Sequence, residues 1–149
     1  MNPHIVEISH REDFSAAHRL VSSALSEDEN RSLFGPCFNL HGHNYGFEAT
    51  VRGPLDERTG MVMNLTDLMR IMRERIYDHV DHKYLNEDVD FLQGMIPTAE
   101  NLAIAFWQRI QACAAELAPS QLVRVRIIES EVNAASYAGP SSFQDSEQS

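Results

Sequence analysis

The sequence predicts a single α+β domain in which strands come first and last and two helices lie between them. Three observations predict this class. The segment 40–53 alternates apolar and polar residues, as a half-buried strand does. The segments 64–80 and 98–117 instead repeat apolar residues at helical spacing. The chain has 149 residues, of which 43% are hydrophobic, and this is enough for one buried core.

The first element, residues 4–20, is predicted as a strand pair or one long strand. Its second half places Phe14, Ala16 and His18 on one face. The alternation changes phase over residues 9–13, so we expect a bulge or a bend there.

Residues 22–36 form a short helical insertion. Ser26 precedes three acidic residues, which is the pattern of an N-cap with a favourable first turn. Gly35 and Pro36 then end the helix. The insertion is expected to deliver Cys37 to the start of the next strand.

That next strand carries two histidines at the end of its apolar face, before a turn-rich loop at 53–60. His41 and His43 are separated by one residue, so their side chains point the same way. His18 supplies a third imidazole if the two strands lie side by side. Three histidines leave one tetrahedral position open, as in a catalytic zinc site. The alternative is that this pair is an accident of polar alternation along a strand.

Two helices follow, and each has one apolar stripe. The first begins at Asn64 or Thr66 and runs to about Val80, and its stripe is Leu65, Leu68, Met69, Met72, Ile76 and Val80. The second begins after Thr98, the predicted N-cap, and ends before Pro119. Its stripe is Leu102, Ala103, Phe106, Ile110, Cys113, Ala114 and Leu117. Cys113 is therefore predicted to be a buried structural residue.

The last strand, residues 122–131, ends in a carboxylate on its apolar face. Glu129 shares the parity of Val123, Val125 and Ile127. A buried acid without a partner costs several kcal/mol, so we expect it to face a ligand or a base. A salt bridge with an arginine is the structural alternative.

Charge and composition narrow the partners. The net charge of −10 disfavours nucleic acid and anionic membranes, and a phosphorylated substrate needs a local cluster of positive charge or a metal. No apolar run approaches the roughly 20 residues of a membrane span, and the N-terminus lacks the pattern of a signal peptide. We therefore expect a cytoplasmic protein. Its two cysteines give no disulfide framework.

Three further residues have the chemistry of proton transfer. A thiol such as Cys37 becomes a base or a nucleophile when its pKa is lowered, as by a nearby metal. Asp81 beside His82 places a carboxylate next to an imidazole that can carry a proton. A thiol on one side of a metal-held substrate and an imidazole on the other suit enolisation next to a carbonyl or hydroxyl carbon.

Six ordered motifs together resemble one family. They are Phe14-Ser-Ala-Ala-His18-Arg-Leu, Cys37-Phe-Asn-Leu-His41-Gly-His43-Asn-Tyr, Thr59-Gly-Met-Val-Met-Asn64-Leu, Asp81-His82-Lys-Tyr-Leu-Asn, Pro97-Thr98-Ala-Glu100-Asn and Glu129. Over residues 5–139 the chain resembles the 6-pyruvoyltetrahydropterin synthase and 6-carboxytetrahydropterin synthase family.

The resemblance implies a role for each motif. It implies that Zn²⁺ is bound by His18, His41 and His43, that Cys37 abstracts a proton, and that Asp81 and His82 form the partner relay. It further implies that Glu129 and Thr98, with the neighbouring Glu100, bind the pterin. A carboxylate such as Glu129 can accept the ring N–H and amino donors of a pterin as a bidentate pair.

The resemblance also implies a fold and an assembly. The family has the tunnelling fold, in which a four-stranded antiparallel sheet carries two helices on one face. Trimers close into barrels and stack as homohexamers with sites between subunits. On this basis residues 1–139 form the domain, and residues 140–149 form a polar tail that we expect to be disordered.

The implied substrate is 7,8-dihydroneopterin triphosphate, with Zn²⁺ acting as Lewis acid and template. Arg19 and Lys83 are the candidates to meet the triphosphate. Three residues separate Cys37 from His41, as in the 6-carboxytetrahydropterin synthases of queuosine biosynthesis, so we favour the carboxy product. The pyruvoyl enzymes of tetrahydrobiopterin biosynthesis carry a longer spacer, although the insertion at 25–35 and the run 60–67 look more like theirs.

Three other readings remain. A family branch that serves folate synthesis has glutamate in place of the cysteine, and Cys37 disfavours it. A three-histidine zinc hydrolase would not need Cys37. A non-catalytic pterin- or metal-binding module would keep the histidines and Glu129 but tolerate loss of Cys37, Asp81 and His82. The presence of all these residues favours catalysis.

Overall fold

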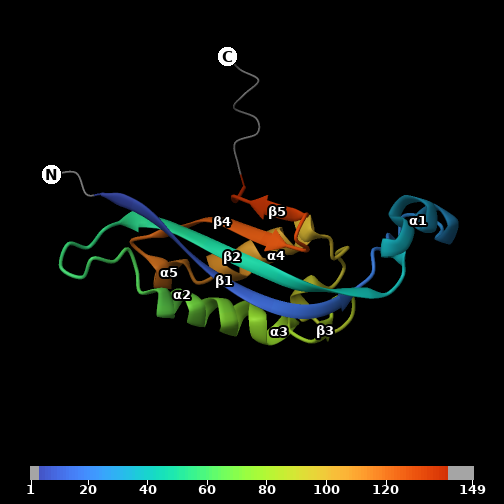
Figure 1. The fold of residues 1–149 in the computed structure, drawn as a ribbon, viewed down its shortest axis with the longest axis horizontal. Helices are drawn as coiled ribbons and strands as arrows, with labels where there is room; N and C mark the ends of the chain where they lie inside the picture. Colours follow the sequence, from blue (N-terminus) through green and yellow to red (C-terminus); the bar gives the residue numbers. More distant parts are fainter. Residues whose placement is uncertain (1–3, 141–149) are drawn as a thin grey trace, which may run out of the picture.

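A computed structural model describes residues 4–140, and in it one five-stranded sheet is packed against helices (Figure 1). The strands are β1 (Ile5–His18), β2 (His41–Pro54), β3 (Lys83–Tyr84), β4 (Gln121–Ile128) and β5 (Ala134–Tyr137). The helices are α1 (Glu27–Phe34), α2 (Leu65–Met72), α3 (Asp78–Val80), α4 (Ala99–Gln111) and α5 (Ala114–Leu117). Shorter helical turns are η1 (Gly35–Phe38), η2 (Arg73–Tyr77) and η3 (Asp90–Leu92). Most of the tail predicted to be disordered lies outside the described residues.

The α+β class is confirmed, but the prediction of four antiparallel strands is wrong. The strand order is β3-β1-β2-β4-β5, and β3 pairs parallel with β1 at Ala16 and Ala17. The other pairs are antiparallel. β3 has two residues and β5 has four, so neither is long enough to show the alternation by which strands are predicted.

The expected bulge in the first strand is also wrong. β1 pairs with β2 without a register shift, from Ile5 opposite Pro54 to His18 opposite His41. The apparent change of phase comes from Glu12, which faces the core side yet is polar and is 8% exposed. Arg73 and His10 both bind its carboxylate, at 2.9 and 2.7 Å. Partners of this kind allow a carboxylate to occupy a mostly buried position.

The insertion forms the predicted helix. The Ser26 side chain accepts a hydrogen bond from the Glu29 N–H, and Gly35 ends α1 with a φ of 55°. In Figure 1, α1 projects beyond one end of the sheet. The prediction that Cys37 begins the next strand is wrong. Cys37 lies on η1, four residues before β2 begins, and it is exposed. The Leu20 N–H donates to the Cys37 carbonyl at 2.8 Å, which ties this turn to the end of β1.

The two main helices begin where predicted. Asn64 caps α2, which continues through the π-helical turn η2 into α3, and Thr98 caps α4. The second helix is interrupted after Gln111, so the stripe expected beyond it is wrong in part: Cys113 is only half-buried and Ala114 is exposed. The turn at Ala112 and Cys113 changes the direction of the following residues, and helical spacing no longer applies across it.

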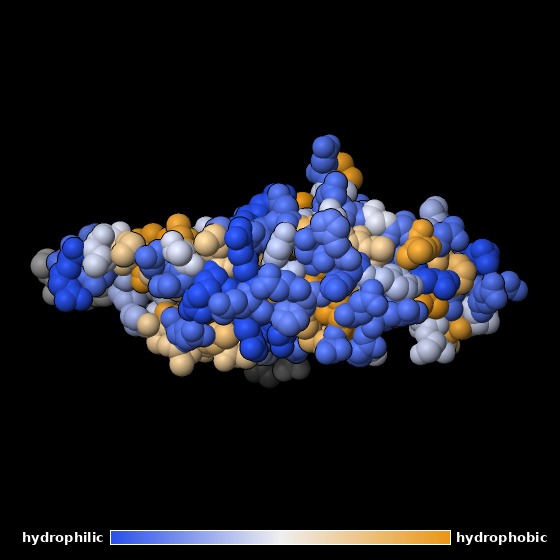
Figure 2. All heavy atoms as spheres, turned by 90° about the horizontal axis from the view of Figure 1, so that it is seen from below, coloured by the Kyte–Doolittle hydropathy of each residue, from blue (hydrophilic) through white to orange (hydrophobic). Residues whose placement is uncertain are grey.

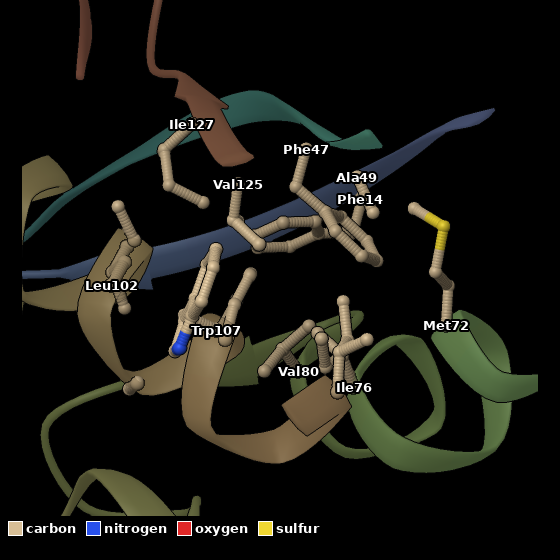
Figure 3. Close-up of a cluster of buried hydrophobic side chains, with 14 of the residues drawn as sticks. Phe14, Phe47, Ala49, Met72, Ile76, Val80, Leu102, Trp107, Val125 and Ile127 are labelled. Carbon is tan, nitrogen blue, oxygen red and sulfur yellow. The ribbon is translucent and has the colours of Figure 1, made fainter. Parts of the chain in front are cut away.

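The core lies between the sheet and one layer of helices (Figure 3). Apolar residues of β1, β2 and β4 meet those of α2, η2, α3 and α4, among them Phe14, Phe47, Met72, Ile76, Val80, Leu102, Val125 and Ile127. Trp107 on α4 is also buried, at 8% exposure, and its ring lies 5.6 Å from that of Tyr137 on β5. The unpredicted strand β5 therefore explains the unpredicted burial of Trp107.

The outer side of the helical layer is mostly hydrophilic (Figure 2), as expected for helices with one buried stripe. Within residues 4–140, no helix has both the length and the apolar character that crossing a membrane requires.

Candidate active site

Three histidines meet at one end of the β1–β2 pair. His18 lies directly opposite His41 in the register, and His43 shares the face of His41. One ring nitrogen from each of the three falls within 4.8 Å of the others. Gly42 allows this packing, because a Cβ at its position would lie 3.0 Å from the Ala16 carbonyl oxygen. The predicted three-histidine cluster is therefore present in the structure.

Two of these rings have their Nδ1 atoms committed to backbone carbonyls. Nδ1 of His18 lies 2.8 Å from the Pro97 carbonyl oxygen, and Nδ1 of His41 lies 2.7 Å from that of Asn39. A carbonyl only accepts, so both Nδ1 atoms carry the proton. Both Nε2 atoms then present lone pairs, and they face each other at 3.0 Å. Two lone pairs at this distance repel unless a cation lies between them, so the donor set fits a metal ion.

Burial favours the neutral form of His18 and of His43. Burial lowers the pKa of His18 to about 4, and the adjacent His41 and His43 lower it as well, against the opposing effect of the Pro97 carbonyl. Burial also lowers the pKa of His43, although the charge of Glu129 raises it. Neutral imidazoles are the ligands that Zn²⁺ takes from histidine.

Cys37 and Glu129 lie close to this cluster. Tyr45, which is buried behind it, has its hydroxyl 3.1 Å from Nδ1 of His18. Burial raises the pKa of Tyr45, and the charges of Glu129 and Cys37 raise it further. Glu129 follows β4 and is half-buried. In residues 4–140, no basic nitrogen lies within 4.0 Å of its carboxylate, so the salt-bridge alternative is not observed.

Asp81 and His82 form a pair at the β3 edge of the sheet, just before β3 begins. Nδ1 of His82 lies 2.8 Å from Oδ2 of Asp81. His82 lines a cavity together with Ser15, Asn44 and the cluster residue His43, and the side chains of Ser15 and Asn44 hydrogen-bond at 2.7 Å. Ser15 and Asn44 have the opposite parity to Phe14 and the three histidines and point away from the helices. Cys37 lines neither of the two cavities to which Asp81 and His82 contribute.

Asp81 is held by three donors. The Ser15 N–H donates to Oδ1 at 3.1 Å, while His82 and the Tyr77 hydroxyl meet Oδ2, the latter at 3.1 Å. Burial acts to raise the pKa of Asp81, but the hydrogen bonds from Ser15, His82 and Tyr77 lower it overall. Sequence reasoning missed Tyr77, because its place on a π-helical turn has no signal in the residue pattern.

Thr98 and Glu100 stand at the start of α4. The Thr98 hydroxyl oxygen accepts from the Asn101 N–H at 3.2 Å, so its observed contact is that of a helix cap. Glu100 is exposed in the first turn. The residue before this cap, Pro97, supplies the carbonyl that orients His18, and sequence reasoning missed this connection between α4 and the cluster.

Comparisons with known proteins agree on one family. The 6-pyruvoyl tetrahydropterin synthase profile matches residues 7–140. The 6-pyruvoyl tetrahydrobiopterin synthase of Drosophila melanogaster is 45% identical over 135 residues, covering 89% of this chain and 79% of its own length. That of Homo sapiens is 43% identical, with 89% and 91% covered. The structure of the Caenorhabditis elegans 6-pyruvoyl tetrahydropterin synthase superposes with a TM-score of 0.85 at 37% identity, covering 93% of this chain and 99% of its own.

The 6-carboxy enzymes are more distant relatives. The 6-carboxy-5,6,7,8-tetrahydropterin synthase of Bacillus subtilis is 27% identical over 114 residues, covering 74% of this chain and 69% of its own length.

Proposed function

The chain belongs to the 6-pyruvoyl tetrahydropterin synthase family, a family of lyases, and we propose that it eliminates triphosphate from 7,8-dihydroneopterin triphosphate to give 6-pyruvoyl tetrahydropterin. One observation carries the choice of product. The pyruvoyl enzymes of Drosophila melanogaster and Homo sapiens are 45% and 43% identical to this chain, against 37% for a putative 6-carboxy enzyme of Archaeoglobus fulgidus and 27% for the 6-carboxy enzyme of Bacillus subtilis. The sequence alone favours the carboxy product, but the higher identity to the pyruvoyl enzymes makes the pyruvoyl product our first choice.

The metal that fits the cluster is Zn²⁺, held by His18, His41 and His43. When bound, it would act as Lewis acid and template for the side-chain oxygens of the substrate. The protein's part is to aim the three imidazoles at one point, and burial favours the neutral form of His18 and His43. The hydrogen bonds from His18 and His41 to backbone carbonyls orient these two rings.

Glu129 binds and orients the pterin ring. Its carboxylate can accept from two adjacent N–H donors of the ring, and no basic side chain in the described part of the chain competes for it. The thiolate of Cys37 takes a carbon-bound proton from the substrate side chain. The imidazole of His82, oriented by Asp81, carries a proton on the opposite side of the substrate.

Because Cys37 lines neither of the cavities to which Asp81 and His82 contribute, we propose that a second copy of the chain supplies the Asp81–His82 pair to each site. The family resemblance gives the same arrangement, a homo-oligomer built from trimers and completed as a dimer of trimers.

A second product is favoured by one specific observation. Only Phe38, Asn39 and Leu40 separate Cys37 from His41, and this short spacer resembles that of the 6-carboxytetrahydropterin synthases. The spacer sets where the thiol stands relative to the metal ligands. The 6-carboxytetrahydropterin reaction is therefore the alternative function.

Product analysis separates the two functions. Purified protein is incubated with 7,8-dihydroneopterin triphosphate, and triphosphate, acetaldehyde and the pterin products are measured together. The proposed function requires triphosphate release without acetaldehyde. Stoichiometric acetaldehyde would establish the alternative, and unchanged substrate would leave neither reaction standing.

A further inference from the structure

A second cavity adjoins the candidate active site. It has a volume of about 780 Å³ and lies between the α1 insertion, the chain that follows β1, and the segment that leads from Cys37 to His41. Its wall includes Arg19, Arg31, Ser22, Ser23 and Phe38. Arg19 directly follows the ligand His18 in the chain, so the cavity begins where the metal cluster ends.

Two guanidinium groups converge on one ring in this cavity. The guanidinium carbon of Arg19 lies 4.3 Å from the centroid of Phe38, and that of Arg31 lies 5.0 Å from it. The two cations are therefore no farther apart than the sum of these distances. Phe38 is the residue after Cys37, and stacking on its face orients both groups.

Arg19 has spare donors. Its Nε donates to the Phe38 carbonyl oxygen at 3.0 Å. Among residues 4–140, no carboxylate oxygen lies within 4.0 Å of its guanidinium group. A guanidinium carries five N–H donors in a fork that matches a phosphoryl group, and the terminal ones of Arg19 remain for a ligand.

Arg31 has a weak partner that an anion can displace. Its Nη2 lies 2.9 Å from Oε1 of Glu27, but the two side chains are 58% and 73% exposed. A pair this exposed contributes little, and a multiply charged anion competes well for the guanidinium.

We propose that this cavity is the subsite for the phosphate chain of the substrate, with Arg19 and Arg31 as its cationic ligands. The inference rests on the proposed function and adds to it, because a chain of net charge −10 must hold a triphosphate by local positive charge. Ser22 and Ser23 add hydroxyl donors on the same wall.

The rival residue is Lys83. It lines a neighbouring cavity, together with His82, and the two cavities share only Tyr84 among their lining residues. The two assignments predict different variants to be defective, and this decides between them.

The test compares Arg31→Leu with Lys83→Met. Arg58→Leu is the matched control, because Arg58 is an exposed arginine paired with Asp56 in the loop at the far end of β2. Kinetics with 7,8-dihydroneopterin triphosphate are measured at constant free Zn²⁺. We expect Arg31→Leu to raise KM about 10-fold, the effect of one lost charge-assisted contact, with kcat little changed. Arg58→Leu should match the wild type, and Lys83→Met should keep the wild-type KM.

Two inhibitors locate the loss. Inorganic tripolyphosphate should inhibit Arg31→Leu about 10-fold more weakly than the wild type. Dihydroneopterin, which has no phosphate, should inhibit both equally, because its ring binding does not involve Arg31. Arg19→Leu should weaken tripolyphosphate in the same direction.

Unchanged KM and tripolyphosphate inhibition in Arg31→Leu, or the defect appearing in Lys83→Met instead, would overturn the subsite. Failure of the proposed function gives a different result, namely a wild-type protein that does not turn the substrate over. Calorimetric binding of tripolyphosphate to wild type and Arg31→Leu, again at constant free Zn²⁺, then still tests the subsite. Equal binding by the two would reject it.

Discussion

The protons on His18 and His41 determine what the cluster can do. Because both Nδ1 atoms donate to carbonyls, neither ring can donate from Nε2, and the 3.0 Å contact between these atoms is not a hydrogen bond between neutral imidazoles. Removing one ring removes the repulsion as well as a metal ligand. We therefore expect His41→Ala to lose zinc and activity together while the fold is retained, because the core lies elsewhere. Zinc content by atomic absorption and the far-UV spectrum measure the two effects, and a metal-free variant with normal turnover would contradict the assignment.

Cys37 separates catalysis from binding. If its thiolate removes a carbon-bound proton, Cys37→Ala should lose about 10² to 10⁴ in turnover, the usual contribution of one general base. Zinc content and pterin affinity should hardly change, since the histidines and Glu129 supply them. Cys37→Ser should be nearly as poor, because a hydroxyl is far less acidic than a thiol. These are measured as single-turnover rates, zinc content and pterin binding.

The control for Cys37 is the other cysteine. Cys113 is half-buried on the turn between α4 and α5 and packs against the core, so Cys113→Ala should affect stability slightly and leave turnover unchanged. Full activity in Cys37→Ala together with loss of activity in Cys113→Ala would show that the reactive thiol is Cys113 and not Cys37.

The Tyr77 hydroxyl lowers the pKa of Asp81, the carboxylate of the proposed relay. This hydroxyl donates to the same Asp81 oxygen that meets His82, and this hydrogen bond contributes to the low pKa of Asp81. Tyr77→Phe removes a donor that favours the charged carboxylate, so the pKa of Asp81 rises and the carboxylate is neutralised at a higher pH. We expect the acidic limb of the pH profile of kcat to move to higher pH. Tyr137→Phe, which removes a hydroxyl on β5, should leave the profile unchanged, and an unshifted Tyr77→Phe profile would contradict this role.

The three-histidine cluster was predictable from the spacing of residues along two strands. His41 and His43 share a strand face, and His18 meets them because β1 and β2 pair in register. The position of His82 in the fold was not predictable. It depends on β3, a strand of two residues that pairs with β1 far along the chain, and no periodicity can reveal such a pairing.

At the scale of elements, one ion pair joins β1 to the helical layer. Glu12 on β1 is mostly buried and is bound by Arg73 of η2 and by His10. Burial acts to raise the pKa of Glu12, but the bonds from Arg73 and His10 lower it below its ordinary value of 4.5. A carboxyl with a lowered pKa contributes stability that is fully present above its unfolded pKa. That stability is lost as the pH falls through the folded value.

Glu12→Gln therefore has a pH-dependent effect. We expect it to lower the free energy of unfolding by about 1 kcal/mol at pH 7, a modest value because the Arg73 side chain is 53% exposed. Below about pH 4.5 the difference from wild type should shrink, because the unfolded wild-type chain then takes up a proton at Glu12, and it should vanish once the pH has fallen through the lower folded pKa. Urea unfolding at pH 7 and pH 4 measures both values. Asp13→Asn, in an exposed pair with Arg11, is the control and should show little change at either pH.

The same pair explains which elements could be predicted. Long elements with a clear period were found, and Ser26, Asn64 and Thr98 cap their helices as predicted. Glu12 broke the alternation of β1 because its partners come from another element, and a sequence pattern does not show them. The interruption after Gln111 and the strand β5 likewise depend on packing between distant segments.

At the scale of the whole molecule, one copy of the chain leaves strand edges open. In the described residues, β3 covers only Ala16 and Ala17 of the 14-residue strand β1 on the side away from β2, and β5 has four residues. Open edges are sites for pairing with another chain. We therefore expect a homo-oligomer built from trimers, and a monomer by sedimentation at micromolar concentration would contradict this.

The positions of Cys37 and His82 make the assembly testable through activity. The thiol lies near the three-histidine cluster, whereas His82 lines a cavity with Ser15 and Asn44 that does not include Cys37. If each site takes its thiol from one copy and its imidazole from another, Cys37→Ala and His82→Ala are each inactive alone. Mixed assemblies would then contain some sites in which both residues are intact. When the two variants are present in equal amounts and mix at random, each of the two copies at a site has an even chance of supplying the intact residue. Roughly one quarter of the sites are therefore restored.

Co-expression of the two variants with different tags, followed by tandem purification, gives the mixed assemblies. Turnover should then reach roughly one quarter of the wild-type rate, since each intact site needs one unmutated residue from each of two copies. The control is a mixture of Cys37→Ala with His41→Ala. In the proposed site Cys37 and His41 come from the same copy of the chain. Every copy in this mixture lacks one of the two residues, so no site is intact and no activity should return. If the Cys37→Ala and His82→Ala mixture is equally inactive, the relay belongs to the same copy as the thiol. His82 would then have to move toward Cys37 when substrate binds.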